Sequence, residues 1–203
     1  MTGLLGKKIG MTQVFTEDSK LVGVTAIEAG PCPILSIKEK RIQLGFAAVG
    51  ENRIKKPIGG YFKKINVTAC KLIREFLKDP AREYRVGEEL KVDIFKPGDF
   101  VDIIGTSIGK GFQGGMKRWH WHGGRRSRGS TSRRRVGSLG SSTTPGRVWK
   151  GHHLPGHMGA ARVTIQNLQV VKIDAQNNLL LVKGAVPGHK NSYLIIRKAK
   201  KKK

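Results

Sequence analysis

Short apolar runs recur along most of the chain, and turn-forming residues separate one run from the next. The runs are rich in Val, Ile, Leu and Phe, so the pattern predicts strands more often than helices. The predicted strands span residues 12–15, 21–28, 34–37, 42–49, 90–95, 100–104, 163–173, 179–183 and 193–197. Turn residues at 17–20, 96–99 and 174–178 predict three hairpins.

A single helix is predicted, near residues 66–80. Thr68 is a suitable N-cap residue, the apolar side chains at 72, 73, 76 and 77 would share one helical face, and Pro80 would end the helix. Several short strands, few helices and many glycine turns favour a mainly-β fold, either a small closed barrel or a sandwich.

The apolar pattern stops between residues 105 and 162. This segment is rich in Gly, Ser and Thr, and neither a helical nor a strand period of apolar residues runs through it. Without an apolar face, the segment cannot form a hydrophobic core of its own. We therefore expect a long, largely irregular extension inserted into a body formed by residues 1–104 and 163–197. A loop of this length is usually functional or disordered, and a flexible linker is the alternative interpretation.

The charge distribution singles out the same segment. The 203-residue chain carries 39 Lys and Arg against 14 Asp and Glu, a net charge of +25. No acid lies between Asp102 and Asp174, whereas residues 105–162 hold twelve Lys and Arg, and a basic tail follows at 198–203. A protein with this balance is expected to bind a polyanion. No apolar run is long enough to span a membrane, so no membrane partner is expected.

Aromatic rings are concentrated there as well, because all three Trp and five of the six His lie between residues 105 and 162. Guanidinium groups pair with phosphates, and Trp, His and Arg planes stack on unpaired bases, a mixture suited to folded RNA. On an extended chain, the Trp-His-Trp-His run at 119–122 would present four rings on alternating sides. The alternative is that the Trp side chains belong to the barrel core. The candidate RNA-binding residues are Lys110, Lys117, Arg118, Trp119, His120, Trp121, His122, Arg125, Arg126, Arg128, Arg133, Arg134, Arg135, Arg147, Trp149, Lys150, His152, His153, His157 and Arg162.

Catalytic and metal sites are not expected. His120 and His122 could chelate zinc from one strand face, but no carboxylate lies nearby to orient the imidazoles, and the surrounding cations would repel a divalent ion. Cys32 and Cys70 form no CxxC pair, and the basic segment lacks the carboxylate of a catalytic triad. We therefore expect no enzymatic activity, cofactor, metal or small-molecule substrate. Two alternatives stay open: a free nucleic-acid-binding protein, such as an RNA chaperone or DNA compactor, and an enzyme built on a barrel.

Several motifs resemble one protein family over nearly the whole chain. The chain opens with GLLGKKIGMT at residues 3–12, and residues 144–151 and 155–159 read TPGRVWKG and PGHMG. Between them lies a spaced signature made of Phe95, Asp102, Gly105, Ser107, the Gly-Lys-Gly of 109–111, Gly114 and Arg118. In these positions the sequence resembles the L3 family of large-subunit ribosomal proteins, of the bacterial type.

The resemblance implies more than composition does. Members of the family have a barrel body of the translation-factor type and a long extension that runs through ribosomal RNA towards the peptidyl transferase centre. The resemblance therefore implies a structural, non-enzymatic protein of the cytoplasmic large subunit that binds 23S ribosomal RNA and nucleates early assembly. Its implied neighbours are ribosomal proteins L14 and L19, and it is not expected to form homo-oligomers.

Overall fold

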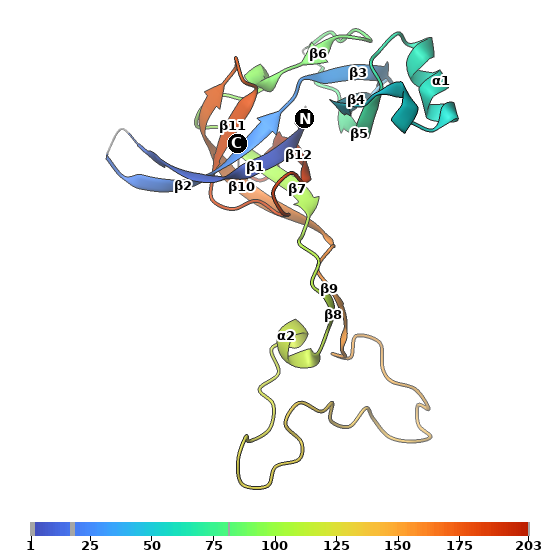
Figure 1. The fold of residues 1–203 in the computed structure, drawn as a ribbon, viewed down its shortest axis with the longest axis vertical. Coiled ribbons are helices and arrows are strands. Elements are labelled where there is room, and N and C mark those ends of the chain that lie inside the picture. The colour runs from blue at the N-terminus through green and yellow to red at the C-terminus, as the bar shows by residue number, and fades with distance from the viewer. Residues whose placement is uncertain (1–2, 17–18, 81, 203) are drawn as a thin grey trace. The chain divides into compact units, whose positions relative to one another are not determined.

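Strands dominate the computed structural model, which describes residues 3–16, 19–80 and 82–202 (Figure 1). The strands are β1 (Gly3–Phe15), β2 (Leu21–Ala29), β3 (Cys32–Ile37), β4 (Arg41–Ala48), β5 (Cys70–Leu77), β6 (Glu89–Leu90), β7 (Phe100–Thr106), β8 (Gly111–Gln113), β9 (Gly156–Met158), β10 (Arg162–Asp174), β11 (Leu179–Lys183) and β12 (Tyr193–Lys198). Two short α-helices, α1 (Lys56–Lys64) and α2 (Gly115–Trp119), accompany them, with 3-10 turns at Glu51–Arg53 and Val92–Ile94.

Six strands close into a barrel in the order β1-β12-β7-β10-β11-β2, and β2 pairs with β1 to complete the ring. The predicted mainly-β fold is confirmed. The predicted hairpin at residues 174–178 joins β10 to β11, with Asp174 opposite Leu179. β1 and β2 form the first predicted hairpin, with Phe15 opposite Leu21, although residues 17 and 18 of its turn lie outside the described residues.

Aliphatic side chains from neighbouring strands fill the barrel. Ile103 of β7 lies opposite Ile196 of β12, and both are fully buried, as are Leu4 of β1 and Leu180 of β11. Each such side chain stabilises the fold by roughly 1.5–3 kcal/mol when it leaves water. β11 and β12 alternate between buried and partly exposed positions, as expected for strands with one buried face, whereas β7 is buried from Val101 to Gly105.

A second sheet contains four strands in the order β5-β4-β3-β6. Helix α1 lies between β4 and β5 in the chain, and its buried Phe62 packs with Leu35 and Cys70 in a small cluster. The sequence pattern did not predict α1, because Gly59 and Gly60 lower its helix propensity. A proline in the first helical turn was the available signal.

The helix predicted near residues 66–80 is wrong, because residues 70–77 form β5. Side chains four residues apart share a strand face as well as a helix face, so Leu72 and Phe76 fit either element. Both pack against the main core, whereas Ile73 packs against the small cluster. Antiparallel pairing with β4, in which Ile42 lies opposite Phe76, favours the strand.

The hairpin predicted around residues 96–99 is also wrong. β6 pairs with β3, Val92–Ile94 forms a 3-10 turn, and β7 pairs with β10 and β12. The turn itself is present, since the Asp99 amide donates to the Lys96 carbonyl at 3.1 Å. It connects two different sheets, because a turn signal specifies a reversal of the chain and not the partner of the strand that follows.

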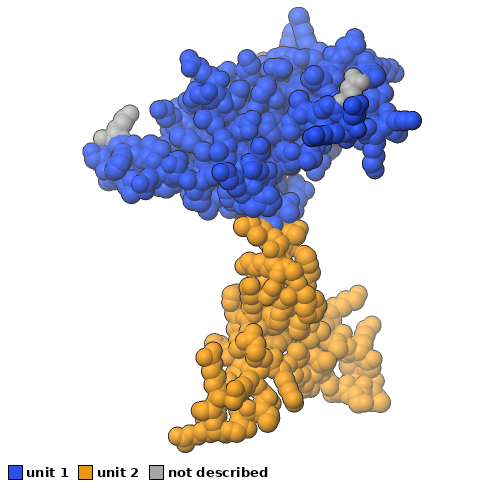
Figure 2. Space-filling view, in the orientation of Figure 1, with its two compact units in different colours: residues 1–107, 162–203 blue, residues 108–161 orange. Residues whose placement is uncertain are grey.

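The chain divides into two compact units, which Figure 2 draws in different colours. Unit 1 comprises residues 1–107 and 162–203 and holds the barrel, the second sheet and both hydrophobic clusters. Unit 2 comprises residues 108–161 and holds β8, α2, β9 and long irregular segments. Neither α-helix in the described part of the chain has the length and apolar character needed to cross a membrane.

Candidate nucleic-acid interface

The candidate RNA-binding residues lie almost entirely in unit 2 and almost entirely on its surface. Arg118 and Trp121 are half-buried, and all the other candidates are exposed. Arg162 belongs to unit 1, where it begins β10 opposite Thr106. No Trp belongs to either hydrophobic cluster, so the alternative that the Trp side chains form the barrel core is wrong.

Unit 2 contains two antiparallel stretches of chain, which we call limbs. One limb holds β8 and α2, the other holds β9, and the pairing of β8 with β9 connects them. β8 pairs with β9, so Gly111 lies opposite Met158 and Phe112 lies opposite His157. The Lys110 amide also donates to the Met158 carbonyl at 2.9 Å. This short ladder holds the start and the end of the irregular segment side by side.

A cluster of side chains at α2 extends the connection between the limbs. The Trp119 ring stacks on the His153 ring, with centroids 4.1 Å apart and planes 6° from parallel. The Trp119 indole N–H and the Arg118 guanidinium both donate to the Leu154 carbonyl, at 2.8 and 2.7 Å. The Arg118 guanidinium carbon also lies 5.0 Å from the Trp119 ring centroid. We call Arg118, Trp119, His153 and Leu154 the limb clamp.

The four rings at residues 119–122 do not form the ladder expected of an extended chain. Trp119 ends α2, and His120 follows in the left-handed conformation with φ of 60°. The Trp121 ring lies over Gly115, where an added Cβ would clash with the indole. Glycine at this position therefore permits the close approach of the ring, and the two indoles occupy separate places.

Beyond the limb clamp the cations are exposed and have no acidic neighbour in the sequence. Arg125, Arg126 and Arg128 precede Arg133–Arg135 in a stretch without helix or strand. The Arg147 guanidinium carbon lies 6.0 Å from the Trp149 ring centroid, and Trp149 is 63% exposed. Since the segment contains no carboxylate, its positive charge is not neutralised within unit 2.

Some residues of this interface escaped the sequence analysis. The Leu154 carbonyl joins the limbs, and Gly115 and Gly156 make room for Trp121 and Arg118. Phe112, which is 76% exposed, adds a further accessible ring. A backbone acceptor or a glycine has no distinctive pattern in one sequence, whereas Phe112 could have been noticed as an aromatic residue inside the basic segment.

The described residues contain neither a candidate metal site nor a reactive cysteine. Among the described residues, no group of three or more His, Cys, Asp and Glu is placed to hold a metal ion. Burial raises the pKa of the Cys32 thiol to about 12, and burial also raises the pKa of Cys70. Both thiols therefore stay protonated at neutral pH, a state in which they are poor nucleophiles.

Replacing Trp119 with alanine should loosen the limb clamp and leave unit 1 intact. The Trp119→Ala change removes a ring stack and an indole hydrogen bond, worth about 1–2 kcal/mol together, so the limbs should open about 5- to 30-fold more often. Hydrogen exchange at the Lys110 amide, which donates to the Met158 carbonyl of the opposite limb, measures this opening.

Trp149→Ala is the matched control, because Trp149 is more exposed and contacts Arg147 instead of the opposite limb. The control should leave the exchange at Lys110 unchanged. Equal acceleration by both variants, or a lower melting temperature of unit 1 with Trp119→Ala, would contradict the assignment of the clamp.

Comparison with known proteins identifies the family. The model of a family described as ribosomal protein L3 matches residues 79–178. Large ribosomal subunit protein uL3 of Brachyspira hyodysenteriae is 49% identical and covers 100% of this chain and 96% of its own length. The same protein of Carboxydothermus hydrogenoformans is 49% identical and covers 99% of both. That of Pelotomaculum thermopropionicum is 50% identical over 98% of this chain and 97% of its own.

The similarity extends over both units, and the basic segment and the barrel strands fall within one continuous match. An identity near one half over the full length leaves no room for a different architecture or a different class of protein. The chain therefore belongs to the ribosomal protein L3 family, and it is a structural component of the large ribosomal subunit and not an enzyme.

Proposed function

We propose that this protein binds 23S ribosomal RNA directly, mainly through unit 2. The observation that carries the proposal is the exposed cationic surface of residues 108–161, which contains Lys and Arg but no acid. Folded RNA supplies closely spaced phosphates at which this charge can be neutralised, and the released counterions favour binding.

Different side chains contribute in different ways. The exposed arginines of residues 125–135 pair with phosphate oxygens, for which the guanidinium fork is well shaped. The accessible rings of Trp149 and Phe112 stack on unpaired bases, at about 1–3 kcal/mol per base. Trp119 is already stacked on His153, so its part is to hold the two limbs in place.

The family resemblance supports a more specific location. In this proposal unit 2 runs through the RNA towards the peptidyl transferase centre, and the protein joins the subunit early and nucleates its assembly. It acts in the cytoplasm as a single copy beside ribosomal proteins L14 and L19. Charge and ring content support only the contact with RNA, whereas the position and the neighbours rest on the family.

Salt dependence of binding tests the contact. With about six to ten phosphate contacts, raising the salt concentration from about 50 to 200 mM should weaken binding to a 23S rRNA fragment by roughly 10³ to 10⁵. The measurement is a filter-binding or fluorescence titration of the full chain at four salt concentrations. A flat salt response would contradict the proposal, and equal affinity for duplex DNA would indicate a general nucleic-acid binder instead.

A further inference from the structure

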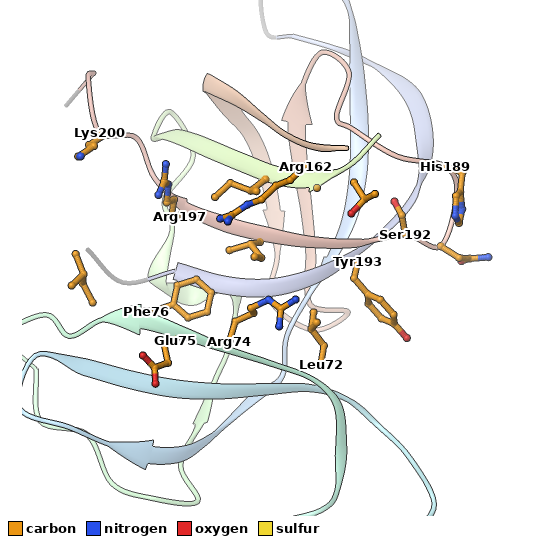
Figure 3. A pocket seen from close by; sticks show the side chains of 16 residues that line it. Leu72, Arg74, Glu75, Phe76, Arg162, His189, Ser192, Tyr193, Arg197 and Lys200 are labelled. Atoms are coloured by element: carbon orange, nitrogen blue, oxygen red, sulfur yellow. The ribbon is translucent and has the colours of Figure 1, made fainter. Parts of the chain in front are cut away.

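Unit 1 contains a cavity that is separate from the basic surface of unit 2. It has a volume of about 780 Å³ and lies between β5 and the barrel strands β7, β10 and β12 (Figure 3). Pockets of this size hold small organic ligands. All the residues that line it belong to unit 1, so the cavity does not depend on the limb clamp or on residues 108–161.

Positive side chains meet at this cavity from distant parts of the chain. Arg74 rises from β5 on one side, and Arg162 and Arg197 lie on barrel strands on the other, with Lys200 nearby (Figure 3). Glu75 is the acidic residue of the lining. Lys38 and Arg41 already engage its carboxylate, at 2.7 and 3.3 Å, and their hydrogen bonds lower its pKa.

Two buried polar atoms at the cavity wall lack hydrogen-bond partners among the described residues. They are the Arg197 Nε and the Ser192 Oγ. The Arg197 Nε lies 3.7 Å from the Oδ2 atom of Asp102, which is buried, so the guanidinium is anchored by charge without a hydrogen bond. The Nε atom therefore lies inside the wall, and the part of Arg197 that is exposed adds positive charge to the cavity.

Apolar side chains make up much of the remaining wall, next to the polar Thr106, His189 and Asn191. Leu72 and Phe76 of β5 line the cavity together with Ile104, Ile195 and Tyr193 of the barrel. The cavity thus combines apolar side chains with the guanidinium groups of Arg74, Arg162 and Arg197. A ligand that matches both has a planar ring at one end and an anion with several oxygens at the other.

We propose that this cavity binds a nucleoside monophosphate unit, with the base against Leu72 and Ile195 and the phosphate between Arg74 and Arg162. A free nucleotide and an unpaired nucleotide of an RNA strand present the same chemistry to the cavity. Inorganic phosphate satisfies the arginines but leaves the apolar wall uncovered, and an acidic peptide brings charge without a planar ring. The site goes beyond the proposed RNA contact of unit 2.

Methyl NMR of the isoleucine-labelled full chain tests the proposal, with the Ile104 and Ile195 methyl groups as reporters of the cavity. Titration with adenosine and uridine 5′-monophosphate should give saturable shifts at both methyl groups. Arg162→Gln and, separately, Arg74→Gln should weaken this binding about tenfold or more, because each removes a charge-assisted hydrogen bond to phosphate. Arg53→Gln, an exposed site outside the cavity, is the control with the same loss of charge and should change nothing.

Further ligands decide between the chemistries. Inorganic phosphate and adenosine alone should each bind at least about tenfold more weakly than the monophosphate. A 5′-phosphorylated dinucleotide that binds more tightly points to an RNA strand as the source, and equal affinity points to a free nucleotide. Absence of saturable shifts, equal binding of inorganic phosphate, equal weakening by Arg53→Gln, or equal binding of a glutamate-rich peptide would each overturn the proposal. The Ile103 methyl group, buried in the barrel, reports whether each variant is folded.

Discussion

Excision of residues 111–159, with Lys110 joined to Ala160, should abolish incorporation into the large subunit and leave the melting temperature of unit 1 within a few degrees of the full chain. The excised segment carries ten Lys and Arg and no acid. Both hydrophobic clusters lie outside it. Because Gly111 lies opposite Met158, the new junction connects chain ends that are already neighbours. Sedimentation of cell lysate through a sucrose gradient measures incorporation, and thermal denaturation followed by circular dichroism measures stability.

A variant in which six arginines of residues 125–135 are changed to lysine separates the contribution of positive charge from that of guanidinium geometry. Lysine keeps the positive charge but lacks the two-pronged guanidinium fork. The variant should enter the subunit at low salt and be lost in a high-salt wash that the unmodified protein survives. The arginines to be changed to lysine are Arg125, Arg126, Arg128, Arg133, Arg134 and Arg135.

The excision prediction fails if the shortened chain sediments with the subunit at the level of the full chain.

Most strands of the barrel were predictable because they carry local signals, whereas the pattern alone left a barrel and a sandwich open. Residues 179–183 alternate between buried and partly exposed positions, and the turn that precedes them contains Asn and Asp. β5 was mistaken for a helix because apolar residues at 72 and 76 satisfy both periods. The pairing of β6 with β3 could not be predicted, since only two residues form the strand and its partner lies far back in the chain.

In the candidate interface, too, the features that local sequence specifies were predictable, and the contacts between distant residues were not. Its charge and its rings are properties of the composition, and the sequence pattern located them in the correct segment. The limb clamp depends on the Leu154 carbonyl and on a left-handed His120, which no spacing of residue types specifies. The cavity of unit 1 was missed for the same reason, because Arg74 and Arg162 come together only when β5 packs beside the barrel.

Replacing Asp102, a buried polar residue, should destabilise unit 1 clearly. Asp102 of β7 is 1% exposed. Its carboxylate accepts hydrogen bonds from the backbone N–H of Asn167 at 3.1 Å and from the backbone N–H of Lys200 at 3.4 Å. Asn167 lies where the pairing of β10 with β7 shifts register. Asp102 thus connects β7 to a bulge in β10 and to the residues that follow β12, while the Arg197 guanidinium lies 3.7 Å from it.

Asp102→Ala removes the acceptor for both amides and leaves the Arg197 Nε buried without a counter-charge. The Arg197 side chain is 36% exposed, so water can solvate its charge when Asp102 is removed. The loss therefore comes mainly from the amides left without an acceptor, which costs about 1–3 kcal/mol, and urea denaturation of the free protein should show a loss in this range. Asp102→Asn retains an acceptor oxygen at similar volume, so its loss should be clearly smaller. A loss below about 1 kcal/mol for the alanine variant, close to the effect of an ordinary surface substitution, would mean that β7, β10 and β12 are held by their ladder and apolar contacts alone. The expected loss would instead make this carboxylate the group that fixes the bulge and sets the position of Arg197 at the cavity.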